Sequence, residues 1–407
     1  MRAYRQVLRA PLILAAALTA SACGGGGGGG GGGSGPSTLP TGPNVASIVV
    51  DSGPAGTVNT PFVSVTICAP GTTDCRTIDH VLVDTASSGL RIISSVLSPA
   101  LSLPAVQDGA GNPMAECMQF ADGYTFGSLV RADVTIASEQ ATSLAVHIIG
   151  DPAFPTVPAN CSSAGPSENT VQTFGANGVL GISVFREDCG AACVNTAVPG
   201  AYYSCPGTGC VSSSMPLANQ VQNPVWRFPV DNNGAIVILR AVDPAGAALV
   251  GGALVFGIDT QSNNRLGSAT VLTVDPATGN LTTLYKGQTL PASFLDTGSN
   301  GLFFTDSSLP VCTGSLAPGF YCPTSAQSLS ATQQSVTGVS RSVSFSIANA
   351  NSLLTNNATF VAFANLAGTN PLAGSFDWGL PFFYGRSVFV ALEGQSTPAG
   401  LGPFLAY

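Results

Sequence analysis

The hydrophobic positions of this chain fall into short runs and not into long helical periods. From about residue 45 onward, β-branched and other apolar residues alternate or cluster between turns rich in Gly, Pro, Asn and Asp, as in the runs 45–50, 62–67 and 235–239. Such runs are typical of β-strands, and no long amphipathic helix is predicted. Many short strands with regular turn signals indicate an all-β chain of the barrel or sandwich class.

One segment of the chain occurs twice. Val83–Leu90 reads V-D-T-A-S-S-G-L and Leu295–Leu302 reads L-D-T-G-S-N-G-L, so Asp, Thr, Ser, Gly and Leu coincide. Each copy follows a short apolar run, and the two copies are separated by about half the chain. We infer two similar lobes, each of which places an Asp, Asp84 or Asp296, at the end of a buried strand.

A single Asp-Thr-Gly string is ordinary turn chemistry, but a pair of them has a chemical rationale. Hydrolysis of a peptide bond by two carboxyl groups needs two Asp side chains in a site that does not ionise both. One stays protonated and polarises the peptide carbonyl, while the other takes a proton from a bound water. The pKa values then belong to the pair. Asp84 and Asp296 are therefore the candidate catalytic pair.

The duplicated loop resembles the Asp-Thr-Gly loops of the pepsin-like aspartic peptidases, and other segments resemble motifs of that family in the same order. Asn177–Ile182 is similar to its D-G-I-L-G-L, Gly251–Asp259 to its G-x-L-x-F-G-G-x-D, and Phe376–Val390 to its terminal I-L-G-D-x-F-x-R-x-x-Y-x-V-F-D. Phe120–Gly127 stands where the family has its flap hairpin, Y-G-D-G-S-x-T-x-G. The resemblance extends over about residues 45–407.

The resemblance implies a bilobal pepsin-like acid protease fold, with two similar six-stranded, barrel-like lobes at 45–230 and 231–407 and an active-site cleft between them. It implies that an extended peptide or an unfolded protein lies in this cleft under the flap and is cleaved at acid pH. Asp84 and Asp296 would hold the nucleophilic water, in a monomer that needs no cofactor and no metal. The threonines of the two loops would cross-link them, and the serines would hydrogen-bond the aspartates. The residues that support the pair would be Thr85, Ala86, Ser87, Thr297, Gly298 and Ser299. The residues of the flap would be Phe120, Asp122, Gly123 and Tyr124.

Three departures from the family pattern leave a second function open. Ala86 replaces the usual Gly of the first loop, where glycine permits a close approach. Phe120 stands where the flap carries Tyr, although Tyr124 nearby offers a phenol, and Asp377 brings a charge into an apolar-apolar-Gly motif. The alternative is a catalytically impaired pepsin-fold lipoprotein that binds peptides or acts as a scaffold at the cell surface. A β-sandwich adhesin is disfavoured, because chance matches would not follow the family's order.

The charge composition and the missing motifs exclude other classes of function. Only 8% of the residues are charged and the net charge is −8, whereas nucleic-acid binding needs clustered cations. His80 and His147 are the only histidines, and no G-x-S-x-G, H-E-x-x-H or G-x-x-x-x-G-K motif occurs. A serine or cysteine hydrolase, a zinc peptidase and a nucleotide-binding enzyme are therefore disfavoured.

The cysteines predict a disulfide framework. The chain has 11 of them, so an even number remains when Cys23 is set aside. An even number in an exported chain is typical of disulfide pairing, and no couple has the spacing with histidines of a zinc site. The sequence leaves the connectivity open. The expected pairs are the close couples and the remaining two cysteines, namely Cys68–Cys75, Cys189–Cys193, Cys205–Cys210, Cys312–Cys322 and Cys117–Cys161.

The N-terminal residues predict export and lipidation. Arginines at positions 2, 5 and 9 precede a short apolar stretch that ends in small residues before Cys23, as in a lipoprotein signal peptide. We expect residues 1–22 to be removed, Cys23 to be lipidated and the glycine-rich remainder of 23–44 to act as a flexible tether. An ordinary secretory signal is the alternative. Gly24 after the cysteine favours the outer membrane, so the predicted location is the bacterial cell envelope, with membrane attachment by the lipid anchor only.

Overall fold

The computed structural model describes residues 38–97, 101–207 and 209–407. The signal peptide, the lipidated Cys23 and the glycine run lie outside the described residues, and they stay predictions. In the described part of the chain, no helix is both long and apolar enough to cross a membrane.

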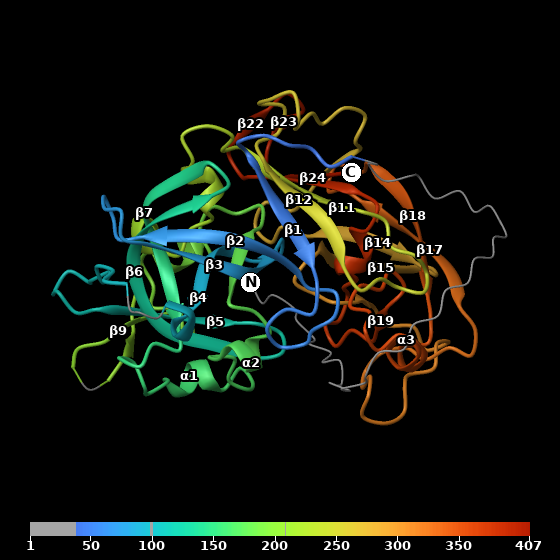
Figure 1. Ribbon diagram of the computed structural model, residues 1–407, viewed down its shortest axis with the longest axis horizontal. Coiled ribbons are helices and arrows are strands. Elements are labelled where there is room, and N and C mark those ends of the chain that lie inside the picture. The colour runs from blue at the N-terminus through green and yellow to red at the C-terminus, as the bar shows by residue number, and fades with distance from the viewer. Residues whose placement is uncertain (1–37, 98–100, 208) are drawn as a thin grey trace, which may run out of the picture.

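The first lobe consists of strands and two single-turn helices, drawn from blue to green in Figure 1. β4 (Ser88–Ile93) and β8 (Gly178–Ile182) are buried along their whole length, as expected for strands in the interior of a lobe. The elements are β2 (Pro61–Cys68), β3 (Cys75–Asp84), β4 (Ser88–Ile93), β5 (Met114–Gln119), β6 (Tyr124–Ile136), β7 (Glu139–Ile149), α1 (Ala159–Ser162), α2 (Val171–Phe174), β8 (Gly178–Ile182), β9 (Tyr202–Ser204) and β10 (Val211–Ser212).

A central group of antiparallel strands joins the first lobe to the second. β1 (Val45–Val50) pairs with β2 on one side and with β12 (Val250–Phe256) on the other. β12 pairs in turn with β11 (Gly234–Leu239), and β11 pairs with β21 (Ser387–Ala391). The first lobe and this group therefore form one 15-stranded sheet. Its central strands are β1 (Val45–Val50), β11 (Gly234–Leu239), β12 (Val250–Phe256), β13 (Val271–Thr273), β21 (Ser387–Ala391) and β24 (Phe404–Ala406). The domain division at residues 230 and 231 stays a prediction, since β1 lies among strands of the second half of the chain.

The second lobe is built on a seven-stranded sheet, drawn from yellow to red in Figure 1. Its strands are β14 (Leu281–Tyr285), β15 (Gln288–Leu295), β16 (Leu302–Phe303), β17 (Gln327–Gln334), β18 (Ser340–Ile347), β19 (Ala367–Gly368) and β20 (Asp377–Trp378). Helix α3 (Ala350–Asn356) is drawn near β19 in Figure 1, and β22 (Ser396–Thr397) and β23 (Gly400–Leu401) form a separate two-stranded hairpin. Short 3-10 turns occur at Ser94–Leu97, Gly190–Cys193, Leu217–Asn219, Pro224–Arg227 and Leu380–Phe382.

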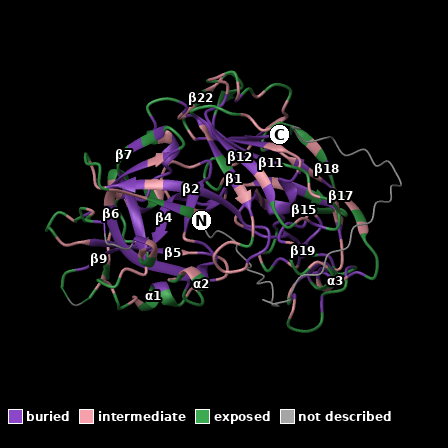
Figure 2. Ribbon diagram, viewed as in Figure 1, coloured by how far each residue is buried: buried purple, intermediate pink, exposed green. Residues whose placement is uncertain are grey.

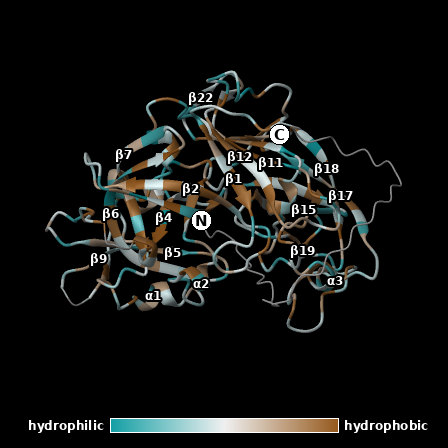
Figure 3. Ribbon diagram, viewed as in Figure 1, coloured by the Kyte–Doolittle hydropathy of each residue, from teal (hydrophilic) through white to brown (hydrophobic). Residues whose placement is uncertain are grey.

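The hydrophobic pattern of the strands explains where the core lies. Buried residues follow the strands of both lobes and of the central group in Figure 2, and the same segments are hydrophobic in Figure 3. The largest apolar cluster contains residues from all three parts, including Val83, Leu254 and Leu295. The all-β, two-lobed architecture expected from the sequence is confirmed.

All five expected disulfides are present. The bonds join Cys68 to Cys75, Cys117 to Cys161, Cys189 to Cys193, Cys205 to Cys210, and Cys312 to Cys322. The Cys117–Cys161 bond closes the longest loop, with a sequence separation of 44, and joins β5 to the segment that contains α1. It therefore ties the base of the predicted flap to the neighbouring chain.

Candidate active site

Asp84 and Asp296 occupy equivalent places in the two lobes. Asp84 is the last residue of β3, and Asp296 directly follows β15. β3 pairs in parallel with β8, where Asp84 lies opposite Gly181, and β15 pairs in parallel with β20. A Cβ on Gly181 would lie 2.6 Å from Ser87 O, so only glycine lets the aspartate loop pass this strand.

Two threonines tie the loops to each other. Thr85 N donates to Thr297 Oγ1 at 3.1 Å, and Thr297 N donates to Thr85 Oγ1 at 3.0 Å. Each hydroxyl then donates across the interface, Thr85 Oγ1 to Leu295 O at 3.0 Å and Thr297 Oγ1 to Val83 O at 2.6 Å. These buried groups satisfy one another, so the arrangement fixes the relative position of the two loops. The cross-link expected of the two threonines is therefore present.

Each aspartate is held by two donors from its own loop. The contacts are the same in both lobes, a backbone N–H to Oδ1 and a serine hydroxyl to Oδ2. The donors are Ala86 N (2.8 Å) and Ser87 Oγ to Asp84, and Gly298 N (2.7 Å) and Ser299 Oγ (2.8 Å) to Asp296. Both aspartates are 0% exposed. The structure thus brings together the two predicted aspartates and all six predicted supporting residues.

The two carboxyl groups are close neighbours. A Cβ on Gly298 would lie 2.9 Å from Asp296 Oδ1 and 3.1 Å from Asp84 Oδ1, so these two oxygens are no more than about 6 Å apart. Burial raises the pKa of Asp296 well above its ordinary value, and the carboxyl groups of Asp84 and Asp377 raise it further. Two carboxyls that are this close and this buried do not both ionise, so the pair carries one proton.

A cavity of about 350 Å³ lies next to the pair. Thr85 and Ala86 line it from the first lobe, and Phe294 and Leu372 line it from the second. Most of the exposed lining is apolar, so the cavity favours an apolar side chain. The methyl group of Ala86, where the family has glycine, forms part of its wall. Among the described residues, no group of three or more His, Cys, Asp and Glu side chains is arranged to hold a metal ion.

The segment predicted to be the flap is a hairpin of β5 and β6. Its turn spans residues 120–123, and Phe120 N donates to Gly123 O at 2.8 Å. Phe120 is buried in a cluster with Leu82 and Val179. Leu82 lies two residues before Asp84 on β3, so both side chains point to the same sheet face. Phe120 therefore packs against the face of β3 to which Asp84 also points, and the role of the turn as a flap stays a prediction.

The phenol of Tyr124 is not at this face. Tyr124 pairs with Gln119 across the hairpin, and its ring belongs to a cluster with Phe126, Tyr203 and the Cys117–Cys161 disulfide. Side chains alternate along a strand, so the ring lies opposite to that of Phe120. The suggestion that Tyr124 replaces the missing flap phenol is therefore wrong. The turn still contains Asp122 and Gly123 as expected, and a Cβ on Gly123 would lie 2.6 Å from Pro166 O.

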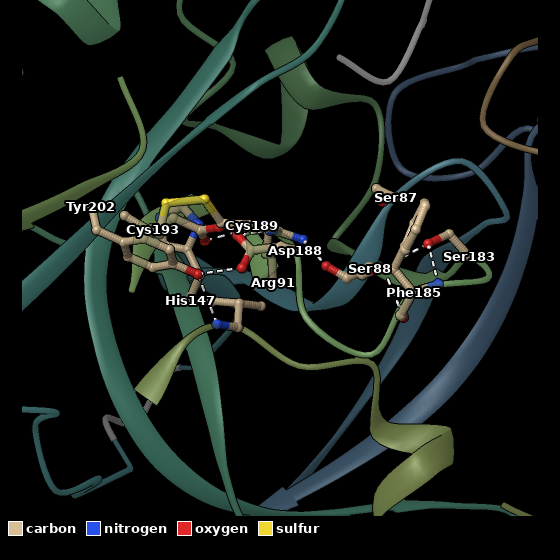
Figure 4. Close-up of polar contacts among 12 residues, drawn as sticks. Ser87, Ser88, Arg91, His147, Ser183, Phe185, Asp188, Cys189, Cys193 and Tyr202 are labelled. Atoms are coloured by element: carbon tan, nitrogen blue, oxygen red, sulfur yellow. Dashed lines mark hydrogen bonds and ion pairs between the residues drawn. A yellow bond between two sulfur atoms is a disulfide. The ribbon is translucent and has the colours of Figure 1, made fainter. Parts of the chain in front are cut away.

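A buried ion network behind the first loop was not predicted. Arg91, on β4, is 0% exposed and contacts Glu116 Oε1 at 2.6 Å, Asp188 Oδ2 at 3.2 Å and Ser88 O at 2.8 Å. Figure 4 shows Arg91, Asp188 and Tyr202 joined next to the Cys189–Cys193 disulfide. Because Glu116 belongs to β5 and Ser88 follows the Asp84 loop, Arg91 joins the base of the flap to that loop.

The charges of this network balance inside the lobe. Burial favours a neutral Glu116, but the nearby Arg91 and His147 outweigh it and hold the pKa of Glu116 well below its usual range. Burial and the Glu116 charge raise the pKa of Asp188, and Tyr202 donates a hydrogen bond to it. Burial lowers the pKa of His147, whose Nδ1 lies 2.7 Å from Glu116 Oε2. These shifts favour one guanidinium facing one carboxylate, on Glu116, with the neutral forms of Asp188 and His147 favoured beside them. The sequence signal was an arginine inside the apolar run 90–93.

A family model described as protein of unknown function (DUF3443) matches residues 40–407. The chain belongs to the DUF3443 family. A search of curated proteins finds no match. One solved structure that matches this DUF3443 chain is the crystal structure of aspartic proteinase from Irpex lacteus, at 15% sequence identity with a TM-score of 0.51. The match covers 89% of this chain and 96% of the proteinase. The pepsin-like, two-lobed fold expected from the sequence is therefore confirmed.

Proposed function

We propose that this chain is an aspartic endopeptidase that hydrolyses peptide bonds with a water activated between Asp84 and Asp296. The observation that supports it most is the pair of equivalent loops, which bury two carboxyl groups side by side and cross-link through Thr85 and Thr297. A buried pair of like charges has no structural benefit, because each carboxyl makes the other harder to ionise. Its chemistry, by contrast, suits a general acid and a general base.

The proposed reaction uses one proton held by the pair. The raised pKa of Asp296 favours that residue as the protonated partner, which leaves Asp84 as the base. Asp84 takes a proton from the water while the water oxygen attacks the peptide carbonyl carbon. At the same time Asp296 gives its proton to the carbonyl oxygen. The C–N bond of the tetrahedral diol then breaks: the leaving amine receives the proton from Asp84, and one diol hydroxyl gives its proton to Asp296. The products are an amine and a carboxylic acid, which ionises after release, and the pair again holds one proton.

The proposed substrate is an extended peptide or an unfolded protein segment. The apolar cavity lined by Ala86 and Phe294 would hold a side chain next to the cleaved bond. Because Asp84 and Asp296 are 0% exposed, a substrate reaches them only when a neighbouring segment moves, and the β5–β6 hairpin is the segment we propose. Hydrolysis of an unfolded protein by the purified chain, from acid to neutral pH and with and without pepstatin, tests this proposal. We expect cleavage that pepstatin blocks.

A second candidate function is peptide binding without turnover. The complete burial of both aspartates and the methyl group of Ala86 at the cavity wall favour it. In this case a peptide would bind the cleft, as measured by calorimetry, and would be recovered intact at every pH. Cleaved peptide in the same samples would exclude this alternative.

Replacing Gly298 with Ala is expected to lower kcat/KM by about tenfold to a hundredfold, the loss that a displaced catalytic group produces. The added Cβ would lie 2.9 Å from Asp296 Oδ1 and 3.1 Å from Asp84 Oδ1, so one carboxyl must move. Steady-state kinetics on a peptide substrate measure the effect. The matched variant is Ala86→Gly, which removes a methyl group at the equivalent place and is expected to lose far less. Equal losses in the two variants would contradict the crowding argument.

We further propose that the enzyme is held at the bacterial cell envelope, in the outer membrane, by a lipid on Cys23. The export signal and the glycine run that follows support this location. Cys23→Ser is expected to move the protein from the membrane fraction to the soluble fraction, as measured by fractionation and by labelling with a fatty acid. Retention of the variant in the membrane, or a wild-type protein without label, would contradict the anchor.

A further inference from the structure

A third buried carboxyl group adjoins the pair. Asp377 is the first residue of β20, which lies between β15 and β16 in the second lobe. In the parallel ladder with β15, Asp377 pairs with Phe294 and Trp378 pairs with Leu295. Paired residues, and residues two apart on a strand, point to the same face. Asp377, Phe294 and Asp296 therefore share one face of the sheet.

The first lobe has no such group at the equivalent position. There β3 pairs with β8, with Leu82 opposite Val179 and Val83 opposite Leu180. Val179 occupies the place that Asp377 takes in the second lobe, and it packs in an apolar cluster. The packing of the sheet thus does not require a polar residue here. Asp377 breaks the symmetry of the two lobes at the position next to the catalytic pair.

The surroundings of Asp377 leave its charge uncompensated. It is 0% exposed, and neither carboxyl oxygen has a hydrogen-bond partner among the described residues. On β16 its partner is the apolar Phe303. The Ser299 hydroxyl donates to Asp296 and also lies near enough to Asp377 to favour its ionised form, and burial outweighs this effect. Burial, followed by the repulsion from Asp84, raises the pKa of Asp377 well above its ordinary value, and no Lys, Arg or His acts on it.

The three carboxyls therefore titrate as one group. The first charge of the group lies on the catalytic pair. The second charge is less costly on Asp377 than on the pair, because Asp84 repels a charge on Asp296 more strongly than Asp377 does. With Asp377 ionised, the pair would lose its last proton only by adding a third charge to the same enclosed site.

We propose that Asp377 is a positioning residue for the catalytic pair: by taking the second negative charge of the site, it keeps the shared proton between Asp84 and Asp296 and extends the working range toward neutral pH. The inference rests on the proposed function for its kinetic consequence. Val179, the apolar residue at the equivalent place in the first lobe, cannot carry a charge and has no such role.

The test is the pH dependence of kcat/KM for wild type, Asp377→Asn and Asp377→Val. Asn keeps the shape without the charge, and Val is the residue of the first lobe at the same place. In both variants, the alkaline limb of the kcat/KM profile is expected to move to a pH about one unit or more below that of wild type, because a neighbouring like charge is lost. The maximal rate is expected to change much less. Asp243→Asn, which removes one charge from the exposed surface, is the control and is expected to leave the profile in place.

An unshifted alkaline limb in both variants would overturn the proposal, whatever happens to the maximal rate. Val keeps the test possible if Asn does not fold. The carbon NMR signals of labelled aspartates give a second readout that needs no turnover. The wild-type signals that disappear in Asp84→Asn and in Asp296→Asn are assigned to the pair. In Asp377→Val, the signals of the pair are expected to show that its last proton leaves at a lower pH than in wild type. If the wild type is inactive but the NMR shift is seen, the proposed peptidase activity is refuted and the role of Asp377 stands. If the wild type is active but the NMR shift is absent, the role of Asp377 is refuted and the peptidase activity stands.

Discussion

Replacing either Asp84 or Asp296 with Asn is expected to lower kcat/KM for peptide hydrolysis by at least about a thousandfold, since groups that act as a unit in catalysis fail together. The amide oxygen of Asn can still accept the hydrogen bond from Ala86 N or Gly298 N, so the loops keep their shape. What is lost is the group that exchanges a proton with water and with the peptide carbonyl. Kinetics of both single variants and of the double variant measure the effect.

The three variants are expected to be almost equally inactive, because one carboxyl alone cannot act as both acid and base. Ser87→Ala, which removes only one hydrogen bond to Asp84, is the matched control and is expected to keep measurable activity. Circular dichroism of each variant is the check that it is folded. Full activity in either Asn variant would mean that a different group performs the hydrolysis.

Replacing Arg91 with Met is expected to lower the free energy of unfolding by about 3–5 kcal/mol, the loss typical of a buried ion pair deprived of one partner. The change leaves Glu116 buried without its guanidinium, next to a carboxyl on Asp188 and an imidazole on His147. Because the folded-state pKa of Glu116 lies below its unfolded value, the stabilisation is fully present at neutral pH and is lost as the pH falls through the folded pKa. Urea unfolding near neutral pH therefore measures the whole effect.

Arg76→Met is the matched control for this change. Arg76 pairs with Asp74 at 3.2 Å on the surface, where such pairs contribute about 0–1 kcal/mol. The double change Arg91→Met with Glu116→Gln is expected to recover part of the loss, because it also removes the uncompensated charge. Similar stabilities for Arg91→Met and Arg76→Met would contradict the account of the network.

The sequence was sufficient for the pair and its loops because these depend on short motifs. The repeat around Asp84 and Asp296 gave both aspartates, and the order of the downstream motifs gave the two-lobed fold. The apolar-apolar-Gly segments pair with the aspartate strands, as in the ladder of Asp84 with Gly181. Four disulfides followed from the close spacing of their cysteines, and Cys117–Cys161 followed because those two cysteines remained.

The remaining features depend on contacts between distant segments. In the sequence, Arg91 is only an arginine in an apolar run, and it is the fold that places Glu116 and Asp188 against it. In the sequence, Asp377 is only a departure from a motif. The register of β20 on β15 places it on the same face of the sheet as Asp296. The face that Tyr124 takes depends on the register of the hairpin, which a motif does not fix.

The most direct test of the catalytic pair is a crystal structure of the chain with pepstatin, whose statine hydroxyl takes the place of the attacking water. We predict that this hydroxyl lies within hydrogen-bonding distance of both Asp84 and Asp296, with the β5–β6 hairpin displaced to admit the inhibitor. An inhibitor bound elsewhere, or two carboxyls too far apart to contact the same hydroxyl, would contradict the account.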